Sequence, residues 1–218
     1  MKSQRTRVKI CGITRLEDAL LADTLGVDAL GFVFVPASAR HLSVGAAADI
    51  IEHVSPFVTI VGLFLNAPRE QVHDALDKIP SMLPQFHGQE EAEYCDSFNR
   101  PYIKALGVGT SMPSDEQLAK YSRASGLLLD SNEPGALGGT GHTFDWSRLE
   151  GKMAKPLVLA GGLNVDNVQR AILEVGPSAL DVSSGVELSK GVKCANTMKQ
   201  FMRAVEQADA KSQTQDIG

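Results

Sequence analysis

The chain alternates between two hydrophobic periods along its length. Eight short runs are almost continuously apolar and are bounded by glycine, proline or polar residues: Val8–Cys11, Ala29–Val35, Val58–Leu65, Met82–His87, Tyr102–Leu106, Gly126–Asp130, Leu157–Ala160 and Ala179–Val182. Continuous rather than alternating hydrophobicity is typical of strands that are buried on both faces of a parallel sheet. The pattern therefore predicts eight buried strands.

Segments with apolar residues at helical spacing separate these runs. The clearest stripes lie within Leu16–Ala22, Ala47–Val54, Val72–Ile79, Val165–Val175 and Met198–Val205. Ser43 is suited to cap the second helix, and Asn164 and Gly176 are suited to begin and end the helix after the seventh strand. The helical pattern is weakest after the fifth and sixth strands, where serine and glycine interrupt it.

Strict alternation of strands and helices leaves two architectures, an open doubly wound sheet and a closed barrel. The count of eight strands favours the barrel, and no glycine-rich dinucleotide fingerprint follows the first strand. No linker or low-complexity segment divides the chain. We predict an α/β fold with a single (β/α)8 TIM barrel over residues 1–206, followed by a polar, flexible tail over residues 207–218.

Composition narrows the classes of partner. The 218 residues are 43% hydrophobic and 22% charged, an ordinary globular balance, and a net charge of -5 without a Lys/Arg cluster argues against nucleic-acid binding. No apolar run has the length of a membrane helix or the form of a signal peptide. Because three cysteines leave at least one thiol unpaired, we expect a cytoplasmic protein with free thiols and no membrane partner.

Barrel enzymes carry their reactive groups where the strands run into the loops that follow them. In this sequence the residues at or just after the ends of the predicted strands are polar or glycine: Cys11, Arg40, Asn66, His87, Lys104, Asp130, Gly161, Gly162 and Asp181–Gly185. Position alone does not separate functional residues from ordinary ones, because apolar strands of any α/β protein end in such residues.

Two glycine-containing loops follow the seventh and eighth strands and suggest an anion site. Gly161 and Gly162 lie in the first loop, and Ser183, Ser184 and Gly185 lie in the second. Glycine lets backbone N–H groups approach an anion, and a short helix after Ser183 would add its dipole. Glycine that serves only tight turns is the alternative, but barrels frequently bind phosphate with these two loops. We therefore predict a small phosphorylated ligand.

An ordered set of segments gives the sequence a family resemblance. They are KICGIT (residues 9–14), GFVFVPASAR (31–40), VGLFLN (61–66), QFHG (85–88), Asp130, GGTG (138–141), FDW (144–146), LAGGLN (159–164) and DVSSGVE (181–187). The set resembles the phosphoribosylanthranilate isomerase family and covers nearly the whole chain. The first and last segments together make the resemblance specific.

The resemblance implies conversion of an aminoaldose phosphate into an aminoketose phosphate, a step of tryptophan biosynthesis. This chemistry needs an acid that protonates the ring oxygen and a base that removes the proton from the sugar C2. The resemblance assigns the base to Cys11 and the acid to Asp130. As a base, Cys11 needs a lowered thiol pKa or a locally shared proton. The structural alternatives are a space-filling cysteine and a capping or salt-bridged aspartate.

Three further residues complete the predicted site. The resemblance implies that Arg40 contacts the anthranilate part, with a solvated surface arginine as the alternative. We expect Asp181 to hydrogen-bond the substrate amine or hydroxyls, unless backbone donors satisfy it, and His87 to line the pocket. Residues 139–141 are expected to form a mobile loop over the mouth. The reaction needs no cofactor, the scattered histidines show no metal-ligand spacing, and we expect a monomer or weak homodimer.

Other interpretations remain open. A sister barrel of histidine synthesis is expected to use two carboxylates, against which Cys11 argues, and an indole-forming synthase would need Lys104 as its acid. A non-catalytic barrel that binds a phosphorylated ligand is the alternative from another class. Lys190–Cys194 also lacks the Pro and Asp that begin the family's last helix, which leaves the start of that helix uncertain. Cys95 and Cys194 match no functional position of the family and are interpreted as structural.

Overall fold

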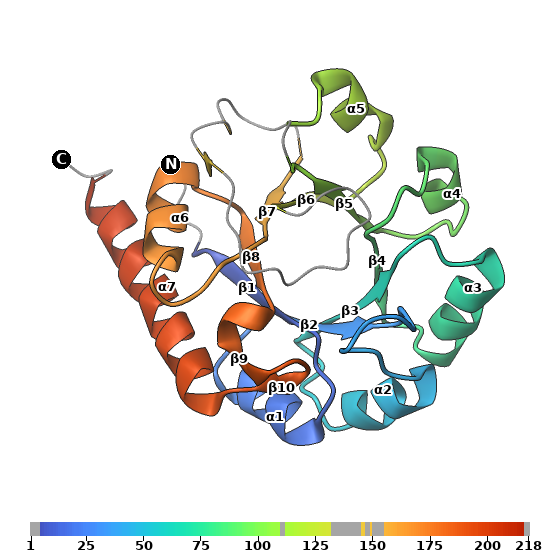
Figure 1. Cartoon of the computed structure of the whole chain (residues 1–218), viewed down its shortest axis with the longest axis horizontal. Helices are drawn as coiled ribbons and strands as arrows, with labels where there is room; N and C mark the ends of the chain where they lie inside the picture. The colour runs from blue at the N-terminus through green and yellow to red at the C-terminus, as the bar shows by residue number, and fades with distance from the viewer. Residues whose placement is uncertain (1–4, 110–111, 132–144, 147–148, 150–154, 216–218) are drawn as a thin grey trace.

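A computed structural model of the chain describes residues 5–109, 112–131, 145–146, 149 and 155–215. Eight parallel strands form a closed barrel, and β8 closes the ring on β1, with Val8 opposite Leu180 (Figure 1). The strands are β1 (Arg7–Cys11), β2 (Ala29–Val33), β3 (Thr59–Phe64), β4 (Leu83–Phe86), β5 (Ile103–Gly107), β6 (Gly126–Asp130), β7 (Leu157–Leu159) and β8 (Ala179–Val182). The predicted barrel and its eight strands are confirmed.

Helices surround the barrel as an outer ring (Figure 1). They are α1 (Leu16–Thr24), α2 (Val44–Ile51), α3 (Arg69–Lys78), α4 (Ala92–Asp96), α5 (Asp115–Lys120), α6 (Val168–Val175) and α7 (Ala195–Gln215). The Ser43 hydroxyl accepts the backbone N–H of Ala46 and caps α2 as predicted. Gly176 ends α6 in a left-handed conformation with φ of 58°. None of the described helices is both long and apolar enough to cross a membrane.

The predicted start of α6 at Asn164 is wrong, because the helix begins only at Val168 with Asn167 as its N-cap. The Asn164 side chain instead accepts the backbone N–H groups of Asp166 and Asn167. It therefore stabilises a turn that precedes the helix. Asn164 therefore accepts backbone N–H groups as a capping residue does, but the element that it caps is this turn and not α6.

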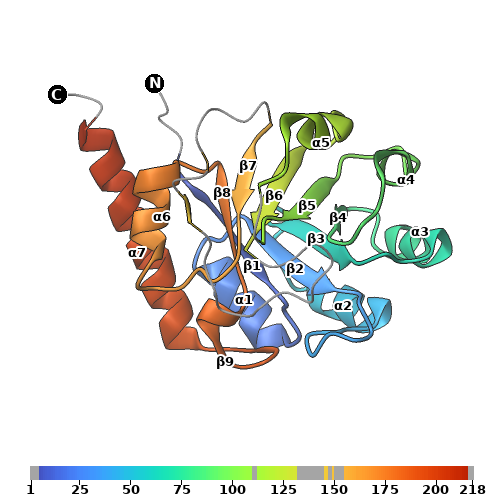
Figure 2. The same cartoon turned by 45° about the horizontal axis from the view of Figure 1, so that its top comes forward.

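The predicted tail from residue 207 is also wrong, because α7 continues to Gln215. Ala208 is fully buried, and the Asp209 carboxylate accepts the backbone N–H and the hydroxyl of Thr6 at 2.8 and 2.6 Å. Figure 2 shows α7 running alongside α6, and it also contacts α1. The apolar stripe of α7 thus extends past Val205 to Ala208, which the polar composition of this segment conceals.

Alternate residues of each strand face two different apolar regions. Leu127, Leu129, Leu180 and Val182 belong to the large core beneath the helices, whereas Leu128 lies in a separate interior cluster. Successive side chains of a strand point to opposite faces, so residues two positions apart lie on the same face. The residues that alternate with the outward-facing ones, such as Leu128, therefore face the barrel interior. By the same alternation, the side chains of Cys11, Asp130 and Asp181 lie inside the barrel, each near the carboxyl end of its strand.

Candidate active site

One pocket lies at the carboxyl ends of the strands and encloses about 710 Å³, open space at its mouth included. Every predicted site residue except Gly185 lines it: Cys11, Arg40, His87, Asp130, Gly161, Gly162, Asp181, Ser183 and Ser184. The predicted mouth loop at residues 139–141 lies outside the described residues.

Cys11 is the last residue of β1, and its free thiol is only 6% exposed. Burial raises the pKa of this thiol, and the Asp181 carboxylate adds to the rise, which outweighs the lowering by Lys9 and Lys193. The thiol pKa is therefore raised in this structure, whereas a general base needs a lowered thiol pKa or a locally shared proton.

Asp130 ends β6 and is also 6% exposed. Its Oδ2 lies 3.4 Å from Nε2 of His87, and Nδ1 of His87 lies 3.1 Å from Nε2 of Gln85. The imidazole ring is therefore held between the Gln85 amide and the Asp130 carboxyl group. This arrangement suits an orienting role for His87.

Asp181 is paired with a lysine that the sequence reasoning missed. Lys9 Nζ lies 2.9 Å from both carboxylate oxygens, and both side chains are almost fully buried. Burial lowers the pKa of Lys9, but Asp181 and Cys11 together raise it above its ordinary value. The alternative in which backbone donors satisfy Asp181 is therefore wrong. Lys9 precedes Cys11 by two residues on one strand, so strand periodicity places both on one face.

Arg40 is 8% exposed, so the alternative of a solvated surface arginine is wrong. It forms a two-bond ion pair with Glu187, with Nε–Oε1 and Nη2–Oε2 distances of 2.8 and 2.7 Å. Such a fork fixes the plane of the guanidinium group. Glu187 closes the DVSSGVE segment quoted above, yet nothing local in the sequence reveals its partner.

Lys193 is a second missed residue of this network. Its fully buried Nζ donates to Glu187 Oε1 at 2.8 Å, to the Cys11 carbonyl oxygen at 2.5 Å and to the Ser183 carbonyl oxygen at 3.3 Å. Glu187 and Lys193 come from a hairpin of β9 (Glu187–Ser189) and β10 (Val192–Lys193), which lies beside α1 (Figure 1). Helix α7 follows at Ala195, directly after the departure at residues 190–194, which gives the start of the last helix that the sequence left uncertain.

The two glycine-containing loops meet at one wall of the pocket. Gly161 and Gly162 have φ of 84° and 63°, and a Cβ on Gly161 would lie 2.1 Å from Ser131 Oγ. The Ser183 hydroxyl oxygen is buried without a hydrogen-bond partner among the described residues. A 3₁₀ turn over Ser184–Val186 follows it. A buried hydroxyl of this kind has the capacity to bind a polar ligand group.

Gly185 does not line the pocket but determines how closely these loops pack. A Cβ on Gly185 would lie 1.9 Å from the Leu163 carbonyl oxygen. We expect Gly185→Ala to force the loops apart and to reduce the free energy of unfolding by about 1–3 kcal/mol, as overpacking does. Chemical denaturation measures this loss.

Gly45→Ala in α2 is the matched control, because nothing lies within 4 Å of its added Cβ. It should be neutral or stabilise the chain by about 0.5–1 kcal/mol. Equal free energies of unfolding for the two variants would contradict the proposed close packing of the loops.

Comparisons with known proteins show which family the chain resembles. Residues 8–204 match the family model of N-(5'-phosphoribosyl)anthranilate (PRA) isomerase. Proteins named N-(5'-phosphoribosyl)anthranilate isomerase from Hahella chejuensis and Pseudomonas putida are 48% and 50% identical, covering 94% and 93% of this chain and 96% and 98% of their own lengths.

Solved structures agree as well. Phosphoribosyl anthranilate isomerases from Thermus thermophilus and Thermotoga maritima superpose with TM-scores of 0.83 and 0.82. Each is 39% identical, and each match covers 93% of this chain and 99% of the solved one. The chain therefore belongs to the N-(5'-phosphoribosyl)anthranilate isomerase family.

Proposed function

We propose that the chain converts N-(5-phospho-β-D-ribosyl)anthranilate to 1-(2-carboxyphenylamino)-1-deoxy-D-ribulose 5-phosphate by an Amadori rearrangement in L-tryptophan biosynthesis. The observation that carries the proposal is the single pocket that Cys11 and Asp130 share with the two glycine-containing loops. The names of the relatives above support the same activity.

The proposed reaction has two proton transfers. The carboxyl group of Asp130 donates a proton to the furanose ring oxygen, and the C–O bond breaks to give an open-chain Schiff base. The thiolate of Cys11 then takes the proton from C2, which leaves an enolamine that tautomerises to the ketone. Catalysis of this kind needs no bound cofactor or metal.

The remaining pocket residues bind the substrate in this proposal. Gly161, Gly162, Ser183 and Ser184 receive the phosphate, with the Ser183 hydroxyl as one donor. Gly185 supports this loop through its packing on Leu163. Arg40 binds the anthranilate carboxylate or ring, because a guanidinium suits both.

Asp181 accepts a hydrogen bond from the substrate amine, and His87 orients Asp130. The proposed groups thus leave the sugar between the two proton-transfer residues.

The buried environment of Lys104 disfavours the indole-forming synthase. Its Nζ is held by Glu90 Oε2 at 2.8 Å and by the Gly88 carbonyl oxygen at 2.7 Å, and the residue does not line the pocket. The thiol of Cys11 in turn disfavours the isomerase that uses two carboxylates.

A turnover assay tests the function directly. Freshly generated N-(5-phosphoribosyl)anthranilate is added to the purified chain, and loss of anthranilate fluorescence is followed. The substrates of the two sister barrels are assayed in parallel. We expect turnover of the first substrate alone. Binding without turnover of any substrate, or turnover of another one, would contradict the proposal.

We further propose that the chain forms one domain that works in the cytoplasm as a monomer or weak homodimer. Cys11, Cys95 and Cys194 are free thiols, which supports a reducing compartment. One solved structure contains monomers generated from the dimeric phosphoribosylanthranilate isomerase of Thermotoga maritima.

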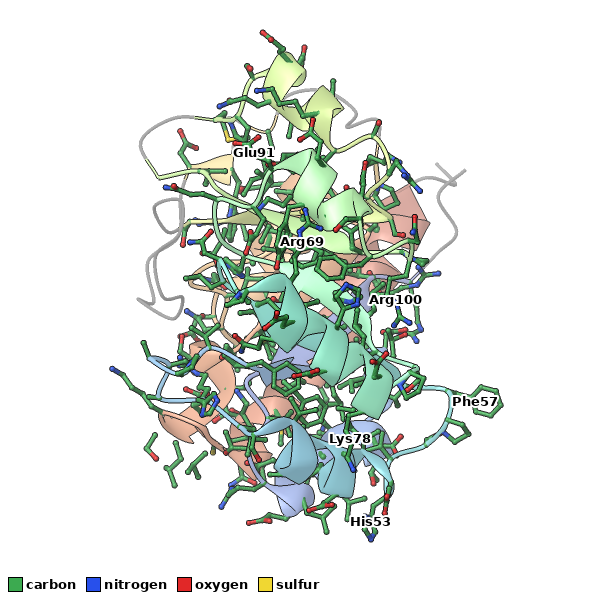
Figure 3. The ribbon with its side chains drawn as sticks, turned by 90° about the vertical axis from the view of Figure 1, so that its right-hand side faces the viewer. His53, Phe57, Arg69, Lys78, Glu91 and Arg100 are labelled. Carbon is green, nitrogen blue, oxygen red and sulfur yellow. The ribbon has the colours of Figure 1, made fainter. Side chains whose placement is uncertain are left out.

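Phe57 is the candidate contact between two copies. It lies between α2 and β3, is 94% exposed and projects from the molecule (Figure 3). We expect Phe57→Glu to be monomeric at concentrations where any dimer of the native chain is populated. Sedimentation velocity over a concentration series measures this, with the exposed His53→Glu as control. A dimer that forms equally well in Phe57→Glu would exclude this contact.

A further inference from the structure

A buried cation lies beside the sulfur of Cys11. Lys9 and Cys11 are two residues apart on β1, and both face the barrel interior. Gly31 is the residue opposite Cys11 on β2, and a Cβ there would lie 2.9 Å from both Cys11 Sγ and Lys9 Cε. The sulfur and the end of the lysine side chain therefore border the same small space.

The same ammonium group is bound by Asp181. Two 2.9 Å contacts join Lys9 Nζ to the carboxylate, and the two side chains are 5% and 8% exposed. Charges attract strongly at this depth, because little water screens them. A thiolate on Cys11 and the carboxylate of Asp181 thus compete for one cation.

We propose that Lys9 is the positioning residue that stabilises the Cys11 thiolate during turnover, and that Asp181 opposes this by competing for the lysine. The inference rests on the proposed function of Cys11 as the base. When the substrate amine donates a hydrogen bond to Asp181, the carboxylate holds Lys9 less strongly. The cation then stabilises the thiolate at the moment when the substrate is in place. Substrate binding and base activation are thereby linked.

The other charged groups near Cys11 are already engaged. Lys193 donates to the carbonyl oxygen of Cys11 and to Glu187, and Arg40 is held in its fork by Glu187. On the far side of the pocket, Asp130 faces His87. Among the charged groups, Lys9 has the largest lowering effect on the thiol pKa, although burial dominates that pKa overall.

Alkylation of Cys11 by iodoacetamide tests the proposal without any substrate, so its outcome can be distinguished from the outcome of the isomerase assay. Only the thiolate reacts, so the rate at a fixed pH below the thiol pKa reports that pKa. Peptide mass spectrometry separates the three cysteines. Cys194, whose thiol pKa is lowered by hydrogen bonds to Thr197, is the internal reference for reagent activity.

The proposal predicts that the alkylation rate of Cys11 changes in opposite directions in Lys9→Gln and Asp181→Asn. We expect Lys9→Gln to alkylate about tenfold more slowly than the native chain and Asp181→Asn to alkylate about threefold to tenfold faster. The double variant, which removes both charges and keeps the buried pair neutral, should lie between them. Arg7→Gln, which removes an exposed cation two residues before Lys9, should react like the native chain.

A merely structural role gives a different pattern, because loosened packing exposes Cys11 and accelerates alkylation in both single variants. Faster reaction of Lys9→Gln, or an unchanged rate in Asp181→Asn, would overturn the proposal. If Lys9→Gln fails to fold, comparison of Asp181→Asn with the double variant decides. Equal rates for those two variants would also overturn it.

Discussion

Replacement of Cys11 by alanine is expected to lower kcat for the isomerisation by about 10³-fold, the range over which a positioned general base acts. The C2 proton then loses its proposed acceptor, whereas the groups proposed to bind phosphate and anthranilate are unchanged. KM should therefore change little. Initial rates of fluorescence loss over a range of substrate concentrations, from below KM to saturation, measure both constants.

Cys194→Ser is the matched control for this prediction. Cys194 lies at the start of α7, outside the residues that line the pocket. Its variant should keep native kcat and KM. A native kcat in Cys11→Ala would exclude the thiol as the base, and a loss confined to KM would assign Cys11 to binding.

Replacement of Asp130 by asparagine should lower kcat by a similar factor, about 10²–10⁴-fold. The amide has almost the size and shape of the carboxyl group and can still contact His87, but it has no acidic proton for the ring oxygen. Folding and KM should therefore be nearly unaffected. The same fluorescence assay gives kcat, and thermal unfolding confirms that the variant is folded.

Asp166→Asn provides the control, because Asp166 is an exposed residue of the turn before α6 and lies outside the pocket. The double variant of Cys11 and Asp130 gives a further test. Residues that serve one reaction are strongly non-additive, so the double variant should lose much less than the product of the single losses. Native kcat in Asp130→Asn would remove the proposed acid.

The features that the sequence predicted well are those with a local signal. Continuous apolar runs identified every strand of the barrel, and Asp130 was correctly expected at the carboxyl end of β6. The stop at Gly176 and the cap at Ser43 also depend only on neighbouring residues. The barrel geometry then brings separate strand ends together at one mouth, which explains why nearly all predicted site residues share the pocket.

The features that were missed depend on pairing between distant segments. Lys9 could have been placed beside Cys11 by strand periodicity, but its partner Asp181 lies on another strand. Glu187 and Lys193 belong to a hairpin that no short pattern predicts. The end of α7 was missed because the segment is mostly polar, and its packing depends on the bonds of Asp209 to Thr6 and on the burial of Ala208.

The contact between Lys193 and the Cys11 carbonyl oxygen can form only late in synthesis of the chain. The two residues are 182 positions apart, so a ribosome must translate most of the message before Cys11 acquires this support. Until β8 emerges, β1 has an open edge that invites pairing with other chains. A chain that stops before the hairpin would carry Cys11 and Asp130, the two proposed proton-transfer residues, without the lysine that joins β1 to the loop after β8.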